Sequence, residues 1–276
     1  MRCSILAPYL ESISCHLTQK ANELFPGSPL CSPIRSSLVG GGLTRPLLSL
    51  LIGEGVGLGI DPIEVTLSVE CFHAASLILD DLPCMDNAQV RRGKPSLHVA
   101  HGEGRALLTT TSLISIAYGN LVSASRSLLS QYPSHPSPLE VCLEIAARCG
   151  GGAGASAGQA LDLLPPKEMS KEYLLQVISL KSAPFFEVAF LYGYLFGGGD
   201  RSSVEALIAP ARDFALSHQL RDDLADRKED KQTTLATLLP YSECLQLLNE
   251  AQERCATSLN QMGLMTPALN ALIFPI

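Results

Sequence analysis

Two acidic clusters interrupt a chain that is otherwise apolar and helical in its patterning. The first is DDLPCMD at residues 80–86, and the second is DDLAD at residues 222–226. Carboxylates are rarely kept beside apolar surface unless a cation pairs with them. Either cluster alone fits a solvated helix end. The two together, with the basic residues described below, favour a divalent-metal site.

Helical periodicity dominates the chain, and strand signals are scarce. Residues 62–81 are apolar on most sides, as expected of a helix in the middle of an all-helical protein, and Pro83 marks its end. Further helices are predicted over 5–24, 44–58, 105–130, 138–165, 170–195, 203–228 and 241–258. The breaks between them are short, so residues 1–276 are predicted to form a single all-α domain.

A glycine-rich run, GGGAGASAG at residues 150–158, has two interpretations. It is either a flexible loop or a helix whose small residues let a neighbouring backbone approach closely. No repeat of 20 to 50 residues is visible.

Composition narrows the class of protein. A formal net charge of −7 argues against nucleic-acid binding, which needs a basic face. No apolar run reaches the roughly eighteen residues that span a bilayer, and Pro8 interrupts the N-terminal segment too early for a secretory signal. We therefore expect a cytoplasmic protein without a transmembrane segment. The nine cysteines are odd in number and form no C-x-x-C pair, so neither a disulfide framework nor a zinc site is expected.

Helical geometry sharpens the prediction of a metal site. Asp222 and Asp226 lie one turn apart on one helix face, and His73 and Asp80 also share a face. Magnesium prefers oxygen ligands and is commonly held by one or two carboxylates, waters and substrate phosphates. The spacing therefore suits a metal shared with a diphosphate.

A diphosphate site also needs cations, and several stand near the clusters or in apolar stretches. Each one alone fits a solvated surface, but together they match diphosphate chemistry. These cations are Arg45, Arg91, Arg92, Lys181 and Lys231.

The order of these motifs resembles the short-chain trans-isoprenyl diphosphate synthases, which make farnesyl or geranylgeranyl diphosphate. The resemblance rests on residues 70–95 (ECFHAASLILDDLPCMD through RRGKP) and 218–226 (HQLRDDLAD), with GQALD at 158–162 and LKSAPFFE at 180–187 between them. It covers roughly residues 5 to 260. It implies an all-α fold around a central active-site cavity, usually in a homodimer. It also implies head-to-tail condensation of isopentenyl diphosphate with an allylic diphosphate.

The resemblance implies a role for each site residue. Three Mg²⁺ ions per active site would be held by Asp80, Asp81, Asp86 and Asp222, with Asp223 and Asp226 in support. The allylic diphosphate would be bound by Arg91, Lys181 and Lys231, and isopentenyl diphosphate by Arg45, His73 and Arg92. Gln219 would lie near the reacting carbons. His73 alternatively fits a satisfied core histidine, and Lys181 fits a lysine that reaches solvent.

In this family, product length is limited by bulk on the first-motif helix, one to two turns before Asp80. Ala75 and Ser76 are small there, which allows a product longer than fifteen carbons, and Phe72 would supply a deeper floor. We therefore expect geranylgeranyl diphosphate, with farnesyl diphosphate as the other product allowed.

Departures from the family pattern keep two alternatives open. Gly42 stands where the family has a lysine that contacts isopentenyl diphosphate, Thr111 stands where it has an aspartate, and the loop after Asp226 is short. These changes favour a catalytically weak or inactive subunit of a heteromeric synthase as the first alternative. The second alternative is a class I terpene cyclase, which shares the fold and metal chemistry but has a different second metal motif.

Overall fold

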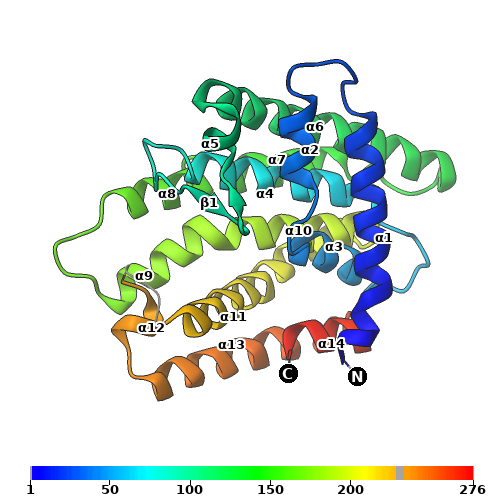
Figure 1. The fold of residues 1–276 in the computed structure, drawn as a ribbon. Helices are drawn as coiled ribbons and strands as arrows, with labels where there is room; N and C mark the ends of the chain where they lie inside the picture. Colours follow the sequence, from blue (N-terminus) through cyan, green and yellow to red (C-terminus); the bar gives the residue numbers. More distant parts are fainter. Residues whose placement is uncertain (1, 228–232, 276) are drawn as a thin grey trace.

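The computed structural model describes residues 2–227 and 233–275 and is almost entirely helical (Figure 1). The α-helices are α1 (Arg2–Glu23), α2 (Cys31–Leu38), α3 (Thr44–Gly55), α4 (Thr66–Asp80), α5 (Leu97–His101), α6 (Glu103–Gln131), α7 (Leu139–Gly150), α8 (Ala155–Leu163), α9 (Lys171–Val177), α10 (Ala183–Phe196), α11 (Ile208–Asp226), α12 (Leu235–Leu238), α13 (Tyr241–Gln261) and α14 (Pro267–Ile273). The expectation of an all-α fold is confirmed.

The helices pack in layers around α4 and α10. Helix α6 covers one side of α4, α3 packs on both α4 and α10, α11 packs on the other side of α10, and α13 lies outside α11 (Figure 1). Ten of the fifteen residues of α4 are buried, as its all-round apolar pattern predicts. Helix α10 is buried along nearly its whole length. These two central helices therefore carry side chains at fixed positions inside the molecule.

Most predicted helices are present, but two are interrupted. The helix predicted over 138–165 is wrong as one piece, since a turn at residues 151–154 separates α7 from α8. A Cβ at Gly151 would lie 2.6 Å from the carbonyl oxygen of Ala147, so the turn requires a glycine there. In the predicted helix over 170–195, α9 leads into a π-helical turn, η2 (Ile178–Ser182), before α10.

Short elements occur at the starts of two predicted helices and in one segment for which no structure was predicted. Two are 3-10 turns, η1 (Ile63–Val65) and η3 (Arg201–Leu207), and η3 replaces the first turn of the helix predicted from residue 203. A small hairpin joins β1 (Val90–Arg91) to β2 (Lys94–Pro95) in antiparallel register. Its two-residue turn is Arg92–Gly93, and both residues have positive φ, as two-residue hairpins with type I′ turns require.

Two segments are long and apolar enough to cross a bilayer, contrary to the sequence-based expectation. They are Glu103–Gln131 and Lys171–Phe196, and 44% and 56% of their most apolar windows are buried inside the protein. Core helices of soluble proteins share this composition, so length and hydropathy alone assign neither helix to a membrane.

Eight of the nine cysteines have described side chains; these eight are free thiols, and five of them are buried.

Candidate active site

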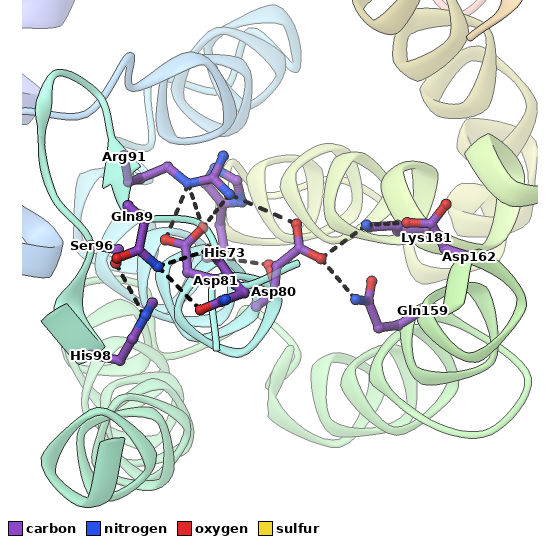
Figure 2. Close-up of polar contacts among 12 residues, drawn as sticks. His73, Asp80, Asp81, Gln89, Arg91, Ser96, His98, Gln159, Asp162 and Lys181 are labelled. Carbon is purple, nitrogen blue, oxygen red and sulfur yellow. Dashed lines mark hydrogen bonds and ion pairs between the residues drawn. The ribbon is translucent and has the colours of Figure 1, made fainter. Parts of the chain in front are cut away.

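The site begins where α4 ends, at Asp80. Its carboxylate accepts a 2.9 Å hydrogen bond from Lys181 Nζ and a 2.8 Å hydrogen bond from Gln159 Nε2 (Figure 2). Lys181 comes from η2 and Gln159 from α8, so three elements far apart in sequence meet at one carboxylate. Charge-assisted hydrogen bonds of this kind are about twice as strong as neutral ones.

Lys181 is held in place by a close approach of two backbones. A Cβ at Gly158 would collide with the backbone of Leu180 and Lys181. Helix α8 therefore lies directly against the π-helical turn, and its Asp162 also accepts a 2.6 Å hydrogen bond from Lys181 Nζ. Burial acts to lower the pKa of Lys181, but Asp80 and Asp162 outweigh it, and the pKa is raised. Lys181 is thus a fixed cation rather than a lysine that merely reaches solvent.

Asp81 lies on the other side of the α4 terminus and is almost fully buried, with 3% of its surface exposed. The guanidinium of Arg91 donates to both of its carboxylate oxygens, with Nε 2.9 Å from Oδ1 and 3.2 Å from Oδ2 (Figure 2). Arg91 Nη2 also lies 3.9 Å from Asp80 Oδ2. The hairpin thus brings Arg91 to the same two carboxylates that end α4.

Asp86 is brought back toward the start of its own cluster. Its backbone N–H donates to the carbonyl oxygen of Asp80 at 3.0 Å. Burial raises the pKa of the Asp86 carboxyl, and the charges of Asp80 and Asp162 add to this rise, while Lys181 opposes it. The local charge is therefore an excess of carboxylates around one ammonium group.

The second acidic cluster lies on the last turns of α11. Asp222 Oδ2 is 3.0 Å from His218 Nδ1, and its side chain is 60% exposed. Asp223 is buried and accepts a 2.8 Å hydrogen bond from Gln219 Nε2. Asp222 and Asp226 lie one helical turn apart, as predicted, and Asp226 is exposed at the end of α11.

The π-helical turn lies between the first acidic cluster and the motif at residues 218–226 that contains the second. Ser182 donates a 3.5 Å hydrogen bond to Gln219 Oε1 of the second motif, while its neighbour Lys181 donates to Asp80 of the first. Adjacent residues of one turn therefore contact both motifs. Turns of this type are rare and are often found at functional sites.

A second polar group lies deeper, between α3 and α4. Arg45 Nη1 is 3.0 Å from His73 Nε2, and the guanidinium lies 4.2 Å from the centre of the Phe186 ring. Burial lowers the pKa of Arg45 to about 10. Burial, followed by the charges of Arg45 and Arg92, lowers the pKa of His73 well below its usual value. His73 is therefore neutral, and because arginine only donates, Nε2 is the accepting nitrogen.

Three buried polar atoms in this group have no hydrogen-bond partner within the described structure. They are Arg45 Nε, His73 Nδ1 and Glu70 Oε1. Buried polar groups in folded proteins are normally paired, so an unpaired set suggests a ligand site. His73 thus has a partner at Nε2 and none at Nδ1 within the described structure.

The positions proposed to limit product length differ in their surroundings. Phe72 lines a cavity of about 310 Å³ between α4, α6, α7 and α10, together with Tyr118 and Phe185. The rings of Phe72 and Tyr118 meet edge to face, 5.3 Å apart. Ala75 is buried in the core, and Ser76 donates to the carbonyl oxygen of His73 at 2.8 Å. Neither of these two lines the cavity.

Among the described residues, no group of three or more His, Cys, Asp or Glu side chains is arranged to hold a metal ion by itself. Asp81 is engaged by Arg91, and Asp80 by Lys181. The chemistry of the donors still fits Mg²⁺, which usually takes only one or two carboxylates and completes its shell with water and substrate phosphates. Asp86, with its raised pKa and neighbouring carboxylates, marks the place where a cation would relieve repulsion.

Three further residues belong to the site although sequence reasoning gave them no role. Gln159 and Asp162 lie within the GQALD segment and were noted only as part of a motif. The sequence signal that could have identified these two residues is their position one turn apart beside an apolar stretch. Glu70 precedes His73 by one turn on the same buried face of α4. Lys231, by contrast, lies outside the described residues.

Comparison with known proteins identifies the family. The polyprenyl synthetase family model matches residues 28–237. The chain belongs to the polyprenyl synthetase family. It is 36% identical to geranylgeranyl pyrophosphate synthase 3 of Arabidopsis thaliana over 196 residues, which cover 69% of this chain and 53% of that protein. It is 35% identical over 213 residues to the large subunit 1 of the heterodimeric geranylgeranyl pyrophosphate synthase of the same plant, covering 72% and 56%.

Solved structures of polyprenyl synthetases and related transferases agree with this assignment. An FPP/GFPP synthase from Zymomonas mobilis matches with a TM-score of 0.83 and 25% identity over 99% of this chain and 97% of that one. A geranyltransferase from Legionella pneumophila matches with a TM-score of 0.82 and 27% identity, over 99% and 94%. The chain spans about half the length of the curated plant relatives that it matches.

Proposed function

We propose that this chain is a Mg²⁺-dependent prenyltransferase that condenses isopentenyl diphosphate head-to-tail with an allylic diphosphate. The observation that carries the proposal is that Lys181 of the π-helical turn donates to Asp80 of the first acidic cluster. Its neighbour Ser182 donates to Gln219, which in turn donates to Asp223 of the second cluster. Carboxylates with fixed cations beside them, as at Asp80 and Asp81, form the kind of charge distribution that a diphosphate leaving group needs.

The residues divide into two groups in this proposal. Asp80, Asp86 and Asp222 would hold Mg²⁺, three ions per site by family resemblance, with Asp223 and Asp226 in support. Asp81, which the sequence also predicts as a ligand, is paired with Arg91 and is therefore given a supporting role. The metal would offset the charge of the departing diphosphate. Arg91 and Lys181 bind the allylic diphosphate from opposite sides of Asp80. Lys231 is proposed to join them. Gln219 lies beside the reacting carbons.

The polar group between α3 and α4 binds isopentenyl diphosphate in this proposal. Arg45, His73 and Arg92 take the diphosphate of isopentenyl diphosphate, which would satisfy the unpaired nitrogens of Arg45 and His73. Neutral His73 offers a hydrogen bond without adding charge. Its neighbour Phe185, whose ring centre is 6.1 Å away, leads from this group to the cavity lined by Phe72.

Geranylgeranyl diphosphate is the proposed product, with farnesyl diphosphate as the shorter alternative. Phe72 stands eight residues before Asp80, which is about 12 Å along the helix. The cavity it lines is placed to accept the far end of a growing tail. Replacing Phe72 with alanine is expected to enlarge the cavity and shift products to longer chains, measured by mass spectrometry of the dephosphorylated alcohols. An unchanged product pattern would contradict the role of Phe72 as the floor.

A product assay tests the activity itself. Purified protein is incubated with Mg²⁺, labelled isopentenyl diphosphate and dimethylallyl, geranyl or farnesyl diphosphate in turn, and products are sized. We expect one discrete elongated product, and we expect Asp81→Ala and Asp222→Ala each to lower turnover by orders of magnitude while the circular dichroism stays helical. Near-normal rates in either variant would refute the roles of these carboxylates. Product from an allylic diphosphate alone would favour a terpene cyclase.

A second candidate function is a weak or inactive subunit of a heteromeric synthase. Gly42, between α2 and α3, stands where the family resemblance leads us to expect a lysine that contacts isopentenyl diphosphate. Two of the plant relatives are named as large subunits of a heterodimeric synthase. Loss of one charged phosphate contact costs roughly tenfold to hundredfold in affinity, which weakens an enzyme more often than it abolishes it. Turnover that appears only after a second synthase is added would support this candidate.

A further inference from the structure

The hairpin places two cations over a loop that has none of its own. The loop between α2 and α3 contains Gly40, Gly41 and Gly42. The guanidinium of Arg92 lies so close to Gly41 that a Cβ there would collide with it. Lys94 Nζ lies 4.0 Å from the position of a Cβ on Gly40. Both cations come from the six-residue segment that also delivers Arg91.

Lys94 differs from the other lysine of the site in its surroundings. Lys181 is paired with two carboxylates. Lys94 is exposed, and its ammonium group forms no ion pair with any residue that the structure describes. An ammonium group held by hairpin geometry at the edge of a site, with no counter-ion, is available to an anionic ligand.

A cavity beside Lys94 supplies further donors. It measures about 590 Å³ and lies between α2 and the hairpin, with Ser32, Arg35 and Ser36 on one wall and Lys94 on the other. No acidic residue lines it. The volume is in the range of small-molecule sites, and two cations with hydroxyl groups between them suit a diphosphate.

Arg92, the other cation of the hairpin, lies near the deeper polar group. Its guanidinium covers Gly41, and after burial its charge contributes to the lowered pKa of both Arg45 and His73. Cations therefore continue from Lys94 through Arg92 to Arg45. Arg92 and Lys94 thus lie beside adjacent glycines of the same loop.

We propose that Lys94 binds the diphosphate of the non-allylic substrate and replaces the cation that the loop lacks at Gly42, with Arg35 on the opposite wall. The inference rests on the proposed function, since it names a further binding residue for the same reaction. Packing does not explain the missing side chain, because a Cβ at Gly42 would meet nothing within 4 Å. In this proposal the positive charge comes from Lys94 of the hairpin instead of from the loop between α2 and α3.

Calorimetric titration of the full chain tests this directly. Isopentenyl diphosphate and geranyl diphosphate are titrated separately into wild type, Lys94→Ala and Lys94→Arg, with Lys167→Ala, an exposed lysine in the loop after α8, as the matched control. We expect Lys94→Ala to raise the Kd for isopentenyl diphosphate roughly tenfold or more and to leave the Kd for geranyl diphosphate unchanged. Lys94→Arg and Lys167→Ala should bind both ligands as wild type does.

A double variant moves the charge back to the loop. Gly42→Lys introduced into Lys94→Ala should restore affinity for isopentenyl diphosphate. An unchanged Kd in Lys94→Ala, or an equal loss for both ligands, would overturn the inference. Wild type that binds isopentenyl diphosphate but forms no product would refute the proposed function alone, and the Lys94→Ala titration would still decide this inference. Wild type without any affinity for isopentenyl diphosphate would overturn both.

Discussion

At the scale of single residues, Glu70 is a buried carboxyl group without a full set of hydrogen-bond partners. It is 1% exposed, and one of its carboxylate oxygens has no partner in the described structure. Burial raises its pKa from 4.5 to about 7, although Arg92 of the hairpin and Arg45 of α3 both act to lower it. A carboxyl group in this position is expected to change its protonation close to neutral pH.

The raised pKa of Glu70 makes the free energy of unfolding depend on pH. Because the folded-state pKa is raised, the folded protein holds the Glu70 proton more tightly than the unfolded chain does. The stabilisation is fully present below about pH 4.5 and is lost as the pH rises through 7. The full shift corresponds to about 3 kcal/mol. Glu70→Gln keeps the shape of the side chain and removes this titration.

We therefore expect the free energy of unfolding of wild type to fall more steeply between pH 5 and pH 8 than that of Glu70→Gln, by about 1–3 kcal/mol. Urea unfolding at both pH values measures the difference. Other groups in the chain titrate in both proteins and cancel in the comparison. Parallel curves for the two proteins would show that Glu70 stays ionised or is solvated.

At the scale of secondary-structure elements, hydrophobic periodicity predicted the long helices, but not the short ones or the breaks between helices. The central helix was predicted at 62–81 and is found as η1 and α4, because its apolar pattern matches its burial. The eight-residue α2 is too short to give a clear period. The break at 151–154 depends on glycines that also fit a helix, so the pattern alone left both interpretations open.

The candidate site was predictable in its residue types but not in its pairings. The acidic motifs and basic residues are visible in sequence, yet the hydrogen bond from Gln159 to Asp80 joins residues 79 positions apart. The π-helical turn that carries Lys181 interrupts a continuous apolar run without any local signal. These contacts arise from tertiary packing, which outweighs local propensity.

The contact of α8 with the π-helical turn gives a prediction at this scale. Gly158→Ala places a methyl group against the backbone of Leu180 and Lys181, neither of which can move as a flexible side chain would. Overpacking of this kind costs about 1–3 kcal/mol, and it would displace Lys181 from Asp80. We expect a lower melting temperature and a weakened affinity for allylic diphosphate.

Gly152→Ala provides the control, since its Cβ would meet nothing within 4 Å in the turn between α7 and α8. Calorimetric melting and titration with geranyl diphosphate should leave that variant near wild type. Equal behaviour of the two alanine variants would mean that α8 is free to move away from the π-helical turn, and the close approach would then have no role in holding Lys181.

At the scale of the whole molecule, α6 and α7 present an apolar face to solvent. Helix α6 has no charged residue between Arg105 and Arg126. Its Leu107, Leu108 and Tyr118 are 48%, 58% and 37% exposed, and Leu143 of α7 is 39% exposed. These four residues define the α6–α7 face. Exposed apolar patches are often surfaces that contact another protein.

We propose a second copy of this chain as the occupant, which corresponds to the homodimer expected from the family resemblance. Tyr118 belongs both to the α6–α7 face and to the cavity lined by Phe72. A partner covering the face would therefore also close the outer side of the cavity. Association and product length are linked in this arrangement, because a tail that reaches Phe72 ends beside the interface.

Leu108→Asp tests the arrangement, because a charge buried without a partner at an interface is strongly unfavourable. We expect wild type to sediment as a dimer and Leu108→Asp as a folded monomer at the same concentration. Leu164→Asp is the matched control, since Leu164 is 79% exposed but lies in the loop after α8, away from this face. A monomeric wild type that dimerises only with an added synthase would replace the homodimer with a heteromeric partner. If Leu108→Asp and Leu164→Asp both remain dimeric, the contact lies on another surface, and Phe72 alone would have to close the cavity.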